Sequence, residues 1–155
     1  MNTKANYMNK YQPKGILNCA LILIFLVLIA SSLHGQTKAD GINGEWLSPQ
    51  KNSRIVIYKK GNNYFGKITW GTGGSSKDEK NPDKALRSRD VIGLEILKDF
   101  EYDGDGNWEN GSIYNPREGK TYSCKMTLKS LTELSIRGYV GVSLFGRTEI
   151  WTRYK

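Results

Sequence analysis

The two ends of the alternating part of this chain carry residues that point to a closed sheet. The tripeptide Gly44–Trp46 opens this part and Trp151–Arg153 closes it. A tryptophan on the first strand and an arginine on the last can meet only if the sheet curls until its edges are neighbours. The guanidinium of Arg153 then lies over the indole of Trp46, a cation–π contact worth about 0.5–2 kcal/mol. The pattern predicts a small barrel in which Gly44, Trp46, Trp151 and Arg153 serve structural closure.

Short runs of alternating polar and apolar residues occupy the chain between these two ends. In Thr121–Leu128, Tyr122, Cys124 and Met126 share one face with Leu128, and the polar residues share the other. Such alternation is typical of half-buried strands, and turn-forming residues separate the runs. We count about eight strands, near residues 43–48, 54–60, 64–71, 92–101, 108–115, 120–129, 133–140 and 146–154. The fold class is therefore all-β, a single antiparallel up-and-down barrel.

One segment, residues 71–89, breaks the alternation. It begins with a Gly- and Ser-rich stretch and continues into Asn81-Pro82-Asp83. We expect one short helical turn near 82–88, with Asn81 as its cap and Pro82 at its first position. A loop of this length is usually a lid, a binding loop or a disordered segment. The glycines do not form a nucleotide-binding loop, because no Gly-Lys-Ser/Thr follows them.

The sequence of the N-terminus predicts a leader for export. Lysines precede an apolar run over residues 16–30, and small or polar residues follow it. This order is typical of a signal peptide, and the run is shorter than the roughly 20 residues of a membrane-spanning helix. We predict a signal peptide over residues 1–35, cleaved after Gly35 or Ser32, and a barrel domain over 36–155 with no stable membrane span after cleavage. The expected location is the periplasm or the exterior of the cell; an uncleaved anchor and a lipoprotein modified at Cys19 are the less favoured alternatives.

The composition after residue 35 excludes several kinds of chemistry. All 15 acidic and 20 of the 23 basic residues lie there, which gives a net charge of +5 that is scattered rather than clustered; we expect no nucleic-acid partner. His34, the only histidine, leaves with the leader, and Cys124 remains as a single cysteine, which we expect to be buried because it shares a face with Met126. The domain then lacks a disulfide, the usual base for a Ser or Cys nucleophile, and a zinc ligand set. We predict no enzyme activity, no cofactor and no metal, and interpret Asp103–Asn107 as a hairpin turn rather than a calcium loop.

Aromatic residues give the strongest indication of a ligand. An eight-stranded barrel is at the size at which side chains fill the interior or leave room for one small molecule, and the sequence is compatible with both. Our first hypothesis is a small apolar or amphipathic ligand in the barrel mouth. Its site residues would be four aromatic side chains lining the cavity and an arginine meeting an anionic group: Tyr58, Tyr64, Trp70 and Tyr122, with Arg87 or Arg137.

Two alternatives stay open. One is a structural or interaction module of the cell envelope with a filled barrel, which would bind another protein through its outer face or the 71–89 segment. The other is a hydrolase that uses carboxylates alone. The sequence leaves the oligomeric state open.

The ordered motifs along the chain resemble a known family. The matching stretches cover nearly the whole predicted domain and include Gly44–Trp46, Tyr64–Ile68, Asn81–Asp83, Leu86–Arg89, Gly111–Pro116, Arg137–Tyr139, Phe145–Thr148 and Trp151–Arg153. They are similar to a family of secreted bacterial domains of unknown function with a lipocalin-like barrel. The chain departs from the family at Asp90, where a proline is usual, and in a shortened stretch at 71–76. The resemblance implies the barrel and the export, and it implies no reaction.

Overall fold

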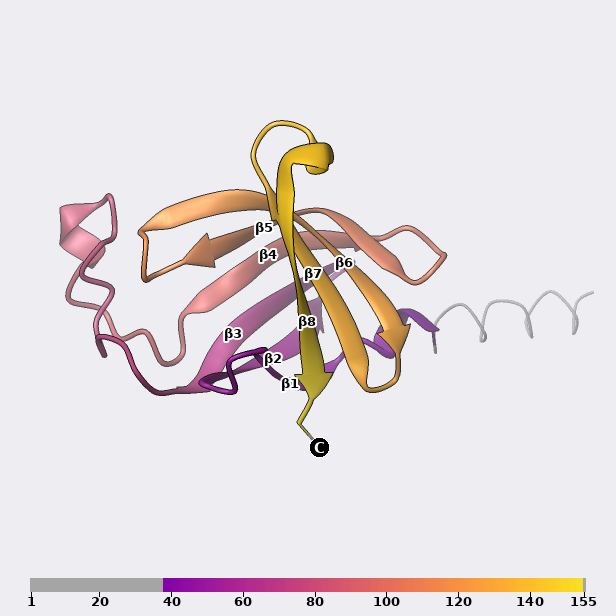
Figure 1. The fold of residues 1–155 in the computed structure, drawn as a ribbon, viewed down its shortest axis with the longest axis horizontal. Helices are drawn as coiled ribbons and strands as arrows, with labels where there is room; N and C mark the ends of the chain where they lie inside the picture. The colour runs from indigo at the N-terminus through magenta and orange to yellow at the C-terminus, as the bar shows by residue number, and fades with distance from the viewer. Residues whose placement is uncertain (1–37, 155) are drawn as a thin grey trace, which may run out of the picture. The chain divides into compact units, whose positions relative to one another are not determined.

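The computed structural model describes residues 38–154, and these form eight strands (Figure 1). The strands are β1 (Gly44–Leu47), β2 (Ser53–Lys60), β3 (Asn63–Gly71), β4 (Glu95–Tyr102), β5 (Asn107–Asn115), β6 (Lys120–Ser130), β7 (Glu133–Tyr139) and β8 (Gly146–Arg153). The alternation of the sequence therefore predicts each strand to within about three residues, because most of the apolar runs end near glycine, asparagine or aspartate residues that favour turns.

The sheet closes on itself. Every strand pairs antiparallel with the next one in sequence, and β8 returns to pair with β1, so the order is β1 to β8 in one closed barrel. The closing pairs are Trp46 with Arg153 and Leu47 with Thr152. The structure confirms the predicted antiparallel up-and-down barrel. Closure also removes the exposed sheet edges that an open sheet of this size would present.

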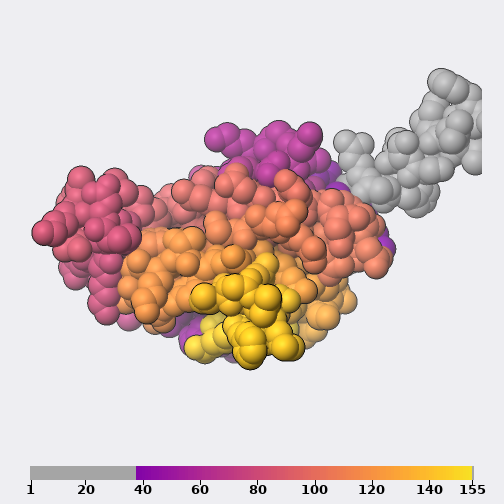
Figure 2. All heavy atoms as spheres, turned by 90° about the horizontal axis from the view of Figure 1, so that it is seen from above, coloured from indigo at the N-terminus to yellow at the C-terminus, as the bar shows by residue number. Residues whose placement is uncertain are grey.

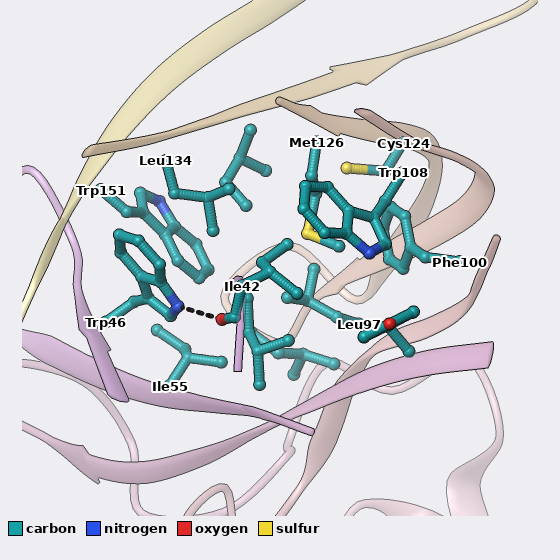
Figure 3. Close-up of a cluster of buried hydrophobic side chains, with 14 of the residues drawn as sticks. Ile42, Trp46, Ile55, Leu97, Phe100, Trp108, Cys124, Met126, Leu134 and Trp151 are labelled. Carbon is teal, nitrogen blue, oxygen red and sulfur yellow. Dashed lines mark hydrogen bonds between the residues drawn. The ribbon is translucent and has the colours of Figure 1, made fainter. Parts of the chain in front are cut away.

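One end of the barrel is filled by large side chains (Figure 3). The fully buried residues there include Trp46, Tyr64, Phe100, Trp108 and Met126. The segment before β1 adds Ile42, whose carbonyl accepts a hydrogen bond of 2.8 Å from the indole N–H of Trp46. Together with Leu97 and Leu134, these residues form a packed core that needs no disulfide.

Glycine makes this packing possible where two strands bring large rings together. Gly111 of β5 lies against Phe100, and a Cβ at Gly111 would lie 2.4 Å from atoms of that ring. Gly66 of β3 leaves similar room for Leu97. The core at this end therefore depends on the absence of side chains at inward positions.

The segment between β3 and β4 contains the expected helical turn, with a different cap. A 3-10 turn covers Lys84–Leu86, and the side chain of Asp83 accepts a hydrogen bond from the backbone N–H of Ala85. Asn81 is not the cap, because its side-chain oxygen accepts from the backbone N–H of Asp83. A second 3-10 turn, Ser143–Phe145, lies between β7 and β8; the sequence analysis did not predict it.

The predicted signal peptide lies outside the described residues, as do Cys19 and His34. Within residues 38–154, no helix is long and apolar enough to cross a membrane.

Candidate functional site

The end of the barrel opposite Ile42 and Trp46 is hollow. A cavity of about 940 Å³ enters the barrel there and opens to solvent. Its inner wall is largely apolar and is built from inward positions of six strands, Ile55, Ile68, Ile96, Ile113, Ile136 and Trp151. The volume lies in the range of small-molecule sites, and so does the mostly apolar lining.

The cavity exists because this end carries smaller inward side chains than the other. Gly138 of β7 lines the cavity, and a Cβ placed on it would meet Ile113 and Tyr122 at 3.5 and 3.8 Å, which are ordinary contact distances. Gly111 and Gly138 both pair with Cys124, one on each side of β6. At Gly111 the space is taken by Phe100, whereas at Gly138 it is open.

Four connecting segments form the rim of the cavity. They are residues 48–52 between β1 and β2, the 71–80 segment at and after the end of β3, residues 116–118 between β5 and β6, and Val140 with Phe145 between β7 and β8. The 71–80 segment belongs to a longer excursion that projects from one side of the barrel (Figures 1 and 2). The 71–89 segment, for which the sequence left a lid, a binding loop and a disordered segment as alternatives, therefore has its first part at the open end.

Three inward-facing side chains of β8, those of Arg147, Glu149 and Trp151, interact with one another. One carboxylate oxygen of Glu149 accepts a hydrogen bond of 3.3 Å from the indole N–H of Trp151. The other oxygen is 3.6 Å from the guanidinium of Arg147, whose side chain is 81% exposed at the mouth. All three residues line the cavity. The wall thus passes from apolar at depth to charged at the mouth, an arrangement suited to an amphipathic molecule.

A buried carboxylate anchors the excursion after β3. Asp78 is fully buried and accepts hydrogen bonds from the hydroxyl of Tyr114 at 2.6 Å and the amide of Asn81 at 2.7 Å. The guanidinium of Arg89 donates two more, at 2.9 and 2.8 Å. Burial opposes ionisation of Asp78, but these donors outweigh it and hold the pKa of the carboxyl below its usual value. Asp78 is a structural anion, and it fixes the loop that forms part of the rim.

The turn between β5 and β6 supports the same loop. Gly119 has a φ of 69°, and a Cβ there would overlap the carbonyl oxygen of Lys80. The backbone of the loop therefore lies directly against the turn. The motif Leu86–Arg89 has a structural role here, because Arg87 donates from Nε to the carbonyl of Asn81 at 2.7 Å.

Of the six residues predicted to bind a ligand, the structure places only Tyr122 in the cavity lining. Tyr64 is inside the barrel but in its filled half, edge-on to Trp108. Arg87 holds the loop, as described above.

Tyr58 and Trp70 lie on the outer surface of the barrel. Ile55 and Ile57 point inward, so Tyr58 points outward, where its hydroxyl donates to Glu95 at 2.6 Å. Burial, followed by the contact with Glu95, raises the pKa of Tyr58 to about 12. Trp70 pairs with Arg54, and a register shift between Arg54 and Ile55 separates this pair from the inward-facing pair Ile55 and Ile68. The guanidinium of Arg54 lies 4.6 Å from the centre of the Trp70 ring. A register shift of this kind re-aims the side chains that follow it.

Arg137 also lies outside the cavity. It donates from Nε to the carbonyl of Ser143 at 2.8 Å and from Nη2 to that of Leu144 at 3.1 Å. A third bond of 2.8 Å reaches the hydroxyl of Thr148. This arginine therefore fixes the β7–β8 connection.

The structure pairs Trp46 with Arg153 at the closed end. The guanidinium lies 4.2 Å from the indole ring centre and donates to the carbonyls of Gly41, Asn43 and Leu131. Gly44 has a φ of 130°, and a Cβ there would lie 2.6 Å from an Arg153 nitrogen. The clasp joins the chain before β1 to the β6–β7 turn.

The isoleucines and Glu149 were not predicted as lining residues. The alternation within each strand could have identified them, since Ile68, Ile136 and Glu149 stand at inward positions. Aromatic side chains were predicted instead because of their type, and most of these point outward or into the packed core. Asp78 carried no signal, because it stands in a run of charged residues.

Two observations on the described residues concern metal ligands and the single cysteine. No three His, Cys, Asp or Glu side chains among residues 38–154 converge to hold a metal ion. Cys124 is fully buried, and this burial raises the pKa of its thiol to about 12. A thiol in this setting is unreactive near neutral pH.

Comparison with known proteins agrees with the fold. Residues 44–153 match the family described as "Uncharacterized protein conserved in bacteria (DUF2147)". No curated protein matches the chain. A solved structure of protein HP1028 from the human pathogen Helicobacter pylori, described as belonging to the lipocalin family, is similar with a TM-score of 0.67 and 23% identity. The similarity covers 74% of this chain and 83% of that one. At this identity the likeness shows a shared lipocalin-like fold.

Proposed function

This chain belongs to the DUF2147 family of bacterial proteins, and from that premise we propose that it is an exported, non-enzymatic barrel that binds one small apolar or amphipathic ligand. The observation that carries the proposal is the cavity of about 940 Å³, walled by isoleucines and Trp151 and open to solvent. The lipocalin-like fold supports it. The cavity also weighs against the filled-barrel alternative.

The ligand would enter with its apolar part toward Ile68 and Ile136. Burial of apolar surface there supplies about 25 cal/mol per Å². A polar group would stay near Arg147 and Glu149, where water still reaches the mouth. Neither residue is fully buried, so each contributes orientation more than affinity.

A fluorescent apolar probe tests this site. N-phenyl-1-naphthylamine should bind with saturation at one molecule per barrel, with a rise in its emission. Gly138→Leu should abolish binding, because the new side chain projects into the cavity from a position where a Cβ meets only ordinary contacts.

The matched control is Ser135→Leu, which places the same side chain on β7 facing away from the buried Leu134 and Ile136. This variant should bind the probe like the unchanged protein. Equal binding by both variants, or no saturable binding by the unchanged protein, would refute the proposed site.

The export part of the proposal rests on residues 1–35. Cell fractionation and the mass of the purified protein test it. We expect a chain that begins after Gly35 or Ser32 in the periplasm or the medium, and a full-length chain in the cytoplasm would contradict it.

A further inference from the structure

The connection between β7 and β8 exposes four large apolar side chains within six residues. Val140, Val142, Leu144 and Phe145 are 70%, 60%, 78% and 76% exposed. Single exposed apolar residues are ordinary, but a contiguous group at a loop tip marks an interaction site. The segment lies at the top of Figure 1 and is uncovered in Figure 2, which is seen from above.

The loop is held in this exposed arrangement by the protein. Arg137 binds the carbonyls of Ser143 and Leu144 and the hydroxyl of Thr148. A 3-10 turn covers Ser143–Phe145. These bonds hold the backbone of the loop while its four apolar side chains stay exposed.

The position of the loop relates it to the cavity. Val140 and Phe145 line the mouth, as do Arg147, Arg117, Lys77 and Lys80. The same rim carries three acidic residues: Glu149 binds Trp151 and Arg147, whereas Glu118 and Glu79 bind the neutral hydroxyls of Tyr122 and Ser75. The apolar tip thus stands beside a rim of four basic and three acidic side chains, on a domain whose net charge after residue 35 is +5, although Lys77 also pairs with Asp90.

We propose that residues 140–145 are a membrane-docking loop, which inserts into a bilayer containing anionic lipid and sets the cavity mouth against it. Apolar side chains at the headgroup boundary, with lysine and arginine beside them, are the features that bind an interface. A protein partner fits less well. A stable protein interface needs about 800 Å² from each partner, and a six-residue tip offers far less.

The proposal goes beyond ligand binding and stands apart from it. Docking depends on residues 140–145, whereas ligand binding depends on the interior, and Arg147 at the mouth is common to both. Gly138→Leu should therefore stop probe binding and leave vesicle binding unchanged, so failure of one proposal is distinguishable from failure of the other.

Flotation with vesicles tests the docking loop. The protein from residue 36 onward should float with vesicles of phosphatidylethanolamine and phosphatidylglycerol, and more weakly with phosphatidylcholine alone. The double variant Leu144→Asp/Phe145→Asp should bind at least about tenfold more weakly, because two apolar side chains no longer enter the bilayer. Arg147→Gln should lower binding to the anionic vesicles about fivefold and have little effect on the neutral ones.

The matched control is Leu131→Asp. The side chain of Leu131 is 72% exposed, a fraction similar to that of Leu144. Leu131 lies in the β6–β7 turn at the closed end of the barrel, whereas the docking loop follows the other end of β7. The Leu131→Asp variant should leave vesicle binding unchanged. Circular dichroism and thermal unfolding check that all variants fold.

Three results would overturn the proposal. The first is that the unchanged protein does not float with the anionic vesicles. The second is that Leu131→Asp weakens binding as much as the double variant does. The third is a dimer in analytical ultracentrifugation that the double variant dissociates, which would assign the loop to a second copy of this chain.

Discussion

Replacing Arg153 by lysine tests the clasp that closes the barrel. Lysine keeps the charge but lacks the planar fork that reaches three carbonyls at once. The carbonyl of Leu131 is exposed and counts little. Those of Gly41 and Asn43 are partly buried, and the distance to Asn43 is 2.9 Å. A lysine ammonium can serve one of them, so one charge-assisted hydrogen bond is lost, at about 1.5–3 kcal/mol.

The stacking on Trp46 adds to this loss. The guanidinium lies 4.2 Å from the ring centre, and losing such a contact at a partly exposed site costs about 0.5–1 kcal/mol. We therefore expect Arg153→Lys to lower the free energy of unfolding by about 2–4 kcal/mol. For a domain of this size that corresponds to a fall in Tm on the order of 10 °C.

Urea unfolding followed by tryptophan fluorescence measures the change. The control is Arg147→Lys, at an arginine whose side chain is 81% exposed and makes one 3.6 Å ion pair; it should change stability by less than about 0.5 kcal/mol. If Arg153→Lys were as stable as this control, the clasp would not close the barrel as we describe.

Three further predictions concern single positions. Gly111→Ala should destabilise the fold by about 1–3 kcal/mol because the Phe100 ring must move, whereas Gly138→Ala should change stability by less than about 0.5 kcal/mol; equal effects in urea unfolding would refute the contrast between filled and hollow ends. Cys124, with a thiol pKa of about 12, should react with a thiol reagent at pH 8 only as fast as the protein opens, and rapid labelling of the folded protein would contradict its burial. The lowered pKa of Asp78 means that its stabilisation is present above the pKa of an unfolded aspartate and is lost as pH falls through the folded value. Asp78→Asn should therefore cost about 1–3 kcal/mol at pH 7 and progressively less toward pH 2, and a cost that is independent of pH would refute the role of its charge.

The strands were predictable because barrel formation depends on local patterns. Alternation set which residues face inward, and turn residues set where each strand ends. Alternation does not predict which distant strands pair. The pair Trp46 and Arg153 predicted that the first and last strands meet, and the structure shows this pairing.

The site was less predictable, since it depends on how much of the interior is left empty. Gly111 and Gly138 look alike in sequence, and only the path of Phe100 decides which one faces open space. Trp70 continues an inward series in the sequence, but a register shift beside Arg54 turns it outward. Arg137 was predicted to contact a ligand, whereas it binds the backbone carbonyls of Ser143 and Leu144. The sequence does not distinguish an arginine that is free to bind a ligand from one that holds a loop.

The central claim is that one end of the barrel holds a small molecule. Native mass spectrometry of the protein purified without detergent from its own host tests it most directly, with organic extraction of the same sample. We predict a population heavier than the polypeptide by one small molecule, which the extraction recovers and which Gly138→Leu lacks. A protein that carries no such molecule, and that binds no apolar probe when one is added, would contradict the claim.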